Sequence, residues 1–161
     1  MALIPTVLTG GLARVLGQPG DNAAAKANDW GAVYQAYAAP AQAAALLPVF
    51  TGTEQSLFVA KLLPVFNNPN STIVQFADAL ASAVEAFWFL PPVPFATVGA
   101  VGAVTGFPGR PILVGQLTGI LASQYDNAIQ PAQQIGGALD VATRTVVVTF
   151  APPPGSTATL V

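Results

Sequence analysis

The sequence predicts a mainly α-helical fold of about four helices with a small β-sheet built around a C-terminal strand, with an α+β arrangement as a variant. Apolar residues recur at spacings of three and four over most of the chain, which is typical of amphipathic helices. One late run is β-branched and alternates between two faces, which favours a strand. The length of 161 residues suits a single domain with its own core.

The two ends of the chain differ in composition from its middle. Residues 1–20 are apolar and contain four glycines and two prolines, which predicts an irregular N-terminal arm that docks on a neighbour or folds back on the core. Residues 151–161 contain three consecutive prolines directly after Ala151 and predict an extended tail. A single helical domain with its C-terminal strand is therefore expected over residues 21–150.

The first predicted helix runs over Ala23–Leu47. Asp21 is a suitable N-cap, and the aromatic residues between Trp30 and Tyr37 fall on one helical face. Pro40 would kink this helix, and the alanine run that follows is expected to continue it.

Two further helices are predicted over Thr53–Phe66 and Ser71–Phe89. Thr51 and Glu54 match a capping box, in which each side chain satisfies a free amide of the first turn. Ser71 is the N-cap candidate of the next helix, which carries the clearest apolar stripe in the chain and must end before Pro91.

The fourth predicted helix covers Pro111–Asp140, with a break at Pro131. The preceding segment, Phe95–Gly109, is small, apolar and rich in glycine. It is compatible with a strand, a tightly packed loop or a contact between subunits. The glycine spacings there match neither phosphate-binding signature, so close packing is the preferred interpretation of these glycines.

The predicted C-terminal strand covers Arg144–Phe150. Val146, Val148 and Phe150 fall on one face, and Thr145, Val147 and Thr149 fall on the other. The strand must pair with the glycine-rich segment, with the tail or with another chain. The residues predicted to contact other subunits are those of its second face and three of the glycine-rich segment: Thr145, Val147, Thr149, Phe95, Val98 and Val101.

The scarcity of charge limits the possible functions. Asp, Glu, Lys and Arg make up 7% of the residues, against about 25% in an average soluble domain. The five basic residues are scattered, so no cluster is available to bind phosphates, and sequence-specific nucleic-acid binding is not expected. A surface so poor in charge suits burial against other protein subunits, contact with lipid, or a soluble monomer coated in small polar residues.

No motif predicts an enzyme, a cofactor or a metal. The chain lacks histidine and cysteine, the commonest general base and two common metal ligands. Asp78 and Glu85 lie on one side of the predicted helix and could form a pair for glycoside hydrolysis, but charges on a solvated face are the preferred interpretation. Asn70-Ser71-Thr72 fits the glycosylation pattern and is read as a helix cap instead.

Two alternatives to an assembly subunit stay open. A membrane-associated protein would insert an apolar hairpin over residues 86–109 into lipid, although the prolines and glycines there disfavour a spanning helix. A soluble binding module would hold a ligand around Trp30, Tyr34 and Trp88. The N-terminus lacks the basic first region of a signal peptide, so secretion by that route is not expected.

The overall style of the chain resembles that of small virion proteins of tailed bacteriophages. The resemblance rests on low charge, abundant alanine, glycine, valine and threonine, the lack of cysteine and histidine, a proline-rich end, and the run LDVATRTVVV that enters the strand. It implies a non-enzymatic structural subunit of the neck, tail, baseplate or capsid decoration. Such a subunit would assemble in the host cytoplasm, would be found in the virion, and would have other copies of itself and other structural proteins as partners.

Overall fold

The computed structural model describes residues 3–18, 22–44, 46–89, 93–97, 100–151 and 156–161. As predicted, the fold is mainly helical with one small antiparallel sheet. The elements in the described residues are six helices and four strands: α1 (Pro5–Gly17), α2 (Ala23–Ala38), α3 (Thr53–Asn67), α4 (Ile73–Phe89), β1 (Pro94–Thr97), β2 (Ala100–Gly106), α5 (Arg110–Ala122), α6 (Ile129–Thr143), β3 (Val147–Ala151) and β4 (Ser156–Thr159).

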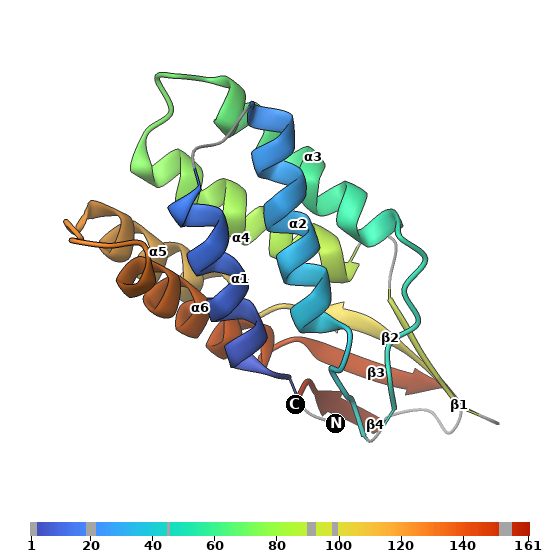
Figure 1. Cartoon of the computed structure of the whole chain (residues 1–161). Coiled ribbons are helices and arrows are strands. Elements are labelled where there is room, and N and C mark those ends of the chain that lie inside the picture. Colours follow the sequence, from blue (N-terminus) through green and yellow to red (C-terminus); the bar gives the residue numbers. More distant parts are fainter. Residues whose placement is uncertain (1–2, 19–21, 45, 90–92, 98–99, 152–155) are drawn as a thin grey trace.

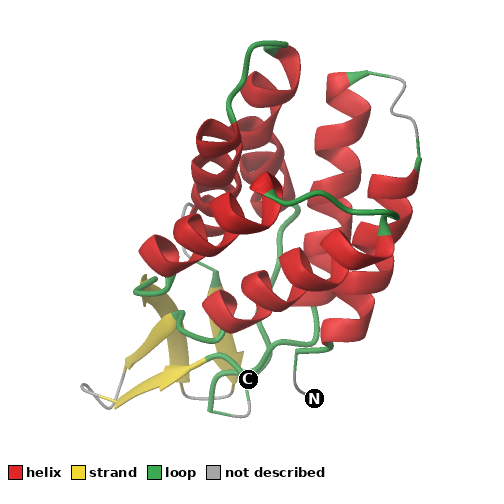
Figure 2. Ribbon diagram, turned by 90° about the vertical axis from the view of Figure 1, so that its left-hand side faces the viewer, coloured by secondary structure: helices red, strands yellow, loops and turns green. Residues whose placement is uncertain are grey.

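The helices pack in a closed cycle, and the sheet lies at one end of the helical body (Figures 1 and 2). Each helix contacts the next in sequence, and α6 returns to contact α1. The sheet connects to this body mainly through β2, which contacts α4. One continuous core therefore extends from the helices to the inner face of the sheet.

The sheet has the order β1-β2-β3-β4, with every pair antiparallel. β3, which begins three residues later than the predicted strand, lies between β2 and β4. Both intramolecular partners considered for it, the glycine-rich segment and the tail, are therefore used at once. The alternation predicted for this strand is confirmed, because Val146, Val148 and Phe150 are all buried.

The estimate of about four helices is too low, and the expected irregular arm is one reason. Residues 5–17 form α1, which starts with Pro5 at its first turn and buries Leu8, Leu12 and Val15. Its glycines obscured the helical spacing, yet Gly11 is needed where it stands. A Cβ added there would lie 2.6 Å from Cγ1 of Val33, so glycine permits the close contact of α1 with α2.

The two longest predicted helices, Ala23–Leu47 and Pro111–Asp140, are each shorter in the structure. The span Pro111–Asp140 forms two consecutive helices, α5 and α6, which are separated by residues 123–128. α2 ends at Ala38 instead of Leu47, since Pro40 cannot continue the helix. The residues that follow run beside the sheet, where Gln42 exchanges two backbone hydrogen bonds with Val161 and the Val49 amide donates to the Pro94 carbonyl.

The helix caps differ in detail from the predicted ones. Asp21 lies outside the described residues, and Asn22 caps α2 by accepting a hydrogen bond from the Ala25 amide. At α4 the cap is Thr72, one residue after the predicted Ser71, and Thr72 and Gln75 satisfy each other's amides as a reciprocal box.

The capping box predicted for α3 is present only in one half. The Glu54 carboxylate accepts hydrogen bonds from the Thr51 and Gly52 amides, as expected. The Thr51 hydroxyl, however, donates to Glu54 Oε1 instead of capping a helix amide. Three donors therefore satisfy a carboxylate that is 1% exposed.

Candidate functional site

The outer face of the sheet, turned away from the helices, is built only from small, apolar and hydroxyl side chains in the described residues. The register places Ala103 opposite Thr149, Thr149 opposite Thr157, and Val147 opposite Thr159. Because side chains alternate along a strand, these residues share the face opposite to the buried Val148 and Phe150. Thr105 and Thr149 also share a hydrogen bond of 2.8 Å between their hydroxyls.

Three of the predicted contact residues lie on this outer face. Val101 is 54% exposed, and Val147 and Thr149 are half-buried beside it. Thr145 precedes β3 in a turn, where its hydroxyl accepts from the Gly109 amide and donates to the Ala142 carbonyl. Val98 lies outside the described residues.

Phe95 faces the opposite way from these residues. It is fully buried and its ring stacks on that of Trp88, with ring centroids 6.4 Å apart. In this chain it is a core residue that anchors β1 to α4, so of the six residues predicted to contact other subunits the structure places Val101, Val147 and Thr149 on the outer face.

The carboxylates considered for catalysis, Asp78 and Glu85 of α4, both meet the guanidinium of Arg110 on α5. Arg110 Nη2 lies 2.9 Å from Asp78 Oδ1 and also donates to the Ser82 hydroxyl, and Arg110 Nε lies 3.0 Å from Glu85 Oε2. The Nε contact is close but is not aligned as a hydrogen bond. One cation therefore links two helices through both carboxylates, an arrangement that holds α4 against α5.

Half of the other described charges are also satisfied within the chain. Asp140 pairs with Arg144, whose pKa is raised by that hydrogen bond. Lys26 donates to the carbonyls of Val15 and Gln18 and so closes the C-terminal end of α1. Among the described residues, the charged side chains that make no ion pair or hydrogen bond to another are Arg14, Asp29, Lys61 and Asp126.

The aromatic residues considered for a ligand pocket are buried, and they contact other side chains of the same chain. Trp88 Nε1 donates to the Tyr34 hydroxyl over 2.9 Å, and that hydroxyl shares a 2.8 Å hydrogen bond with Thr143 Oγ1. Burial raises the pKa of Tyr34 well above its ordinary value, which keeps the phenol neutral. Trp30 is also buried and packs edge-on against Phe76. These groups hold α2, α4 and α6 together.

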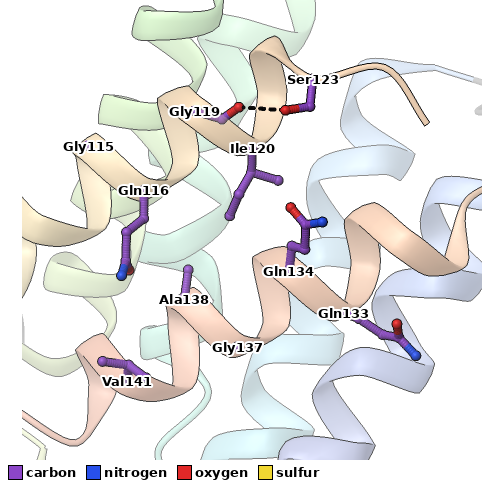
Figure 3. A pocket seen from close by; sticks show the side chains of 10 residues that line it. All are labelled: Gly115, Gln116, Gly119, Ile120, Ser123, Gln133, Gln134, Gly137, Ala138 and Val141. Atoms are coloured by element: carbon purple, nitrogen blue, oxygen red, sulfur yellow. Dashed lines mark hydrogen bonds between the residues drawn. The ribbon is translucent and has the colours of Figure 1, made fainter.

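An open groove of about 500 Å3 runs between α5 and α6 (Figure 3). Its lining consists of three glycines, three glutamines, a serine and three apolar side chains, with no charged residue. Gln116 and Ile120 project from α5 toward α6, and Gln134 projects back toward α5. No prediction from the sequence singled out this groove. The pair Gly115 and Gly119, spaced by four on one helix, was the available signal.

Comparisons with known protein families, with characterised proteins and with solved structures give no match for this chain. Within the described residues, no helix has the length and apolar character that crossing a bilayer would require. The same residues bring together no group of three potential metal-ligating side chains. The function must therefore be argued from the surfaces described above.

Proposed function

We propose that this chain is a non-enzymatic structural subunit that covers much of its surface with other protein subunits. The observation that carries the proposal is the low charge of the chain, in which Asp, Glu, Lys and Arg make up 7% of the residues. Of the twelve charged residues in the sequence, five basic and seven acidic, only four described side chains remain without a partner in the chain. Surfaces that stay in water usually devote about 25–35% of their residues to charge.

The apolar side chains left on the surface support the same proposal. Eleven large hydrophobic residues in the described part are exposed, and they are distributed over α1, the segment before α3, the start of α4, the sheet and the α5–α6 face. Single exposed apolar residues are ordinary. Their coincidence with so few charges is typical of a surface that proteins cover.

The chain forms a compact unit without any partner. Its accessible surface is 7626 Å2, close to the ~7,500 Å2 expected for a compact monomer of this mass. Assembly would thus join preformed subunits and would not be needed to complete the core. A virion of a tailed bacteriophage, with this chain in the neck, tail, baseplate or capsid decoration, is the setting proposed from the resemblance in composition.

The outer face of the sheet offers one docking surface whose role can be tested without disturbing the core. Lysine at Val101, Thr157 and Thr159 would place three cations on a face that is exposed in the single chain. Light scattering should then show lower mass at high concentration, because covering these cations would require removing them from water. Ala36→Lys, at an exposed position of α2, is the matched control. An equal effect of the control would mean that added charge acts generally. If none of the variants changes the mass, the sheet face is not a docking surface.

A further inference from the structure

A tight turn that follows α2 holds one residue in a backbone conformation that its side chain disfavours. Ala43 and Leu46 exchange two backbone hydrogen bonds, of 3.0 and 2.9 Å, which is the pattern of a tight hairpin turn. Ala44 has a φ of 48° and is the one non-glycine residue with a positive φ among the described residues. A residue with a Cβ is disfavoured about five- to thirtyfold in that conformation. Glycine, asparagine and aspartate usually form such turns, so this turn is built from an unsuitable residue.

The two helices before the turn are attached to each other. A Cβ added at Gly11 of α1 would lie 2.6 Å from Cγ1 of Val33, so the backbones of α1 and α2 are in close contact. Lys26 of α2 also donates to the Val15 and Gln18 carbonyls at the end of α1, over 2.8 and 2.6 Å. α1 and α2 are therefore one packed unit, and the turn connects this unit to the rest of the chain.

This α1–α2 unit packs on the rest of the chain through specific buried contacts. α1 contacts α6, and α2 contacts α3. The Tyr34 hydroxyl accepts from Trp88 Nε1 and shares a hydrogen bond with Thr143, and the Tyr37 hydroxyl donates to Asp140 over 2.6 Å. These contacts define one docking position for the unit, whether it belongs to the same chain or to another copy.

We propose that this chain exchanges its α1–α2 unit with a second copy, so that each unit packs on α3 and α6 of the partner. This inference rests on the proposed function and names a second copy as one of the partners. Every contact between the unit and the rest of the fold is kept in the exchanged dimer, so no additional surface is required. The two states differ at the turn, which opens in the dimer and releases Ala44 from its disfavoured conformation.

The single chain also closes its own core, so exchange is an alternative to the closed monomer and not a condition for folding. High protein concentration during folding favours it, because the unit of one copy then meets the docking position of another before its own turn closes.

Glycine at position 44 tests whether the turn favours exchange. Ala44→Gly removes the Cβ that disfavours the positive φ, so the melting temperature of the monomer should rise. The dimer fraction after refolding from urea at high concentration should fall at least about tenfold, since each dimer opens two turns. Ala36→Gly, at an exposed position of α2, is the matched control and should lower the melting temperature without changing the dimer fraction. An unchanged dimer fraction in Ala44→Gly would overturn the proposal.

A pair of introduced cysteines distinguishes exchange from any other mode of association. The chain has no cysteine, and a Cβ at Gly136 of α6 would lie 3.6 Å from Cβ of Thr9 on α1, a distance that suits a disulfide. The variant with Thr9→Cys and Gly136→Cys is refolded over a range of concentrations and then oxidised. Exchanged dimers should give a covalent mass of twice 16.3 kDa in denaturing electrophoresis without reductant, and monomers should give 16.3 kDa.

Gly11→Cys with Val33→Cys is the matched control, because both positions lie in the exchanged unit and their Cβ atoms would be 3.3 Å apart. Its disulfide should stay within one chain in both states. Dimers in which the Thr9–Gly136 disulfide also stays within one chain would overturn exchange and leave self-assembly intact. Equal covalent dimer from both cysteine pairs would also overturn exchange, since it would show random oxidation. A chain that forms no dimer at any concentration would overturn both exchange and self-assembly.

Discussion

Replacing Tyr34 by phenylalanine tests whether the buried hydrogen bonds among α2, α4 and α6 hold the helical body together. The change removes one oxygen and leaves the Trp88 indole N–H and the Thr143 hydroxyl without their partner, in a region where all three side chains are at most 1% exposed. A buried polar group that loses its partner costs about 1–3 kcal/mol. The free energy of unfolding should therefore fall by about 2–5 kcal/mol.

The assay is urea unfolding followed by circular dichroism, with two comparison variants. Thr143→Val removes only one hydrogen bond and should cost about 1–3 kcal/mol, and the double variant should cost less than the sum because the two changes share that bond. Tyr125→Phe is the matched control. Its hydroxyl donates at a half-buried site to Ile120 or Gln134, where water can replace it, and should cost about 1 kcal/mol or less. Equal losses for Tyr34→Phe and Tyr125→Phe would refute the reasoning.

Three other predictions concern packing, alkaline stability and the link between α4 and α5. Gly102→Ala should destabilise the chain by about 1–3 kcal/mol in urea unfolding, because the added Cβ would lie 2.5 Å from the Phe150 ring. Unchanged stability would contradict the close contact between Gly102 and Phe150. Burial raises the pKa of Tyr37 above 10.0, so its contribution to stability is complete below about pH 10 and declines at higher pH. Tyr37→Phe should make the decline in the free energy of unfolding shallower by about 1.4 kcal/mol per pH unit. An unchanged slope would exclude this contribution of Tyr37. Arg110→Met should cost about 1 kcal/mol or less, and the cost should shrink in high salt, since the pairs are partly exposed; a salt-independent loss would mean that packing of the side chain dominates.

The sequence was sufficient to predict the elements whose pattern is local. α4 carries an uninterrupted apolar stripe from Ala77 to Trp88, and its predicted bounds differ from the observed ones by two residues at the start. β3 was recognised because β-branched residues alternate there. In both cases the side chains that define the element are also the ones that enter the core.

The elements that were missed depend on contacts between distant segments. α1 contains three glycines that disfavour a helix in isolation, and it is stable because Leu8, Leu12 and Val15 enter the core between α2 and α6. β4 has no apolar alternation of its own and is positioned by its pairing with β3. Local propensity carries no information about such pairing.

The candidate surfaces were predictable to a similar extent. The alternation around β3 placed Val147 and Thr149 on the face that is turned away from the helices. The burial of Phe95 could not be foreseen, since it depends on which side of the sheet β1 directs that ring toward Trp88. The α5–α6 groove required knowing that the predicted single helix is two helices that pack together.

The central claim, that this chain is a subunit built to be covered by other subunits, is tested most directly by its mass in solution. Light scattering without detergent, over a range of concentrations, compares the observed mass with 16.3 kDa for one chain. The account predicts a mass that exceeds this value and rises with concentration toward a dimer or a larger assembly. A mass equal to one chain at every concentration would contradict self-assembly through the surfaces described above.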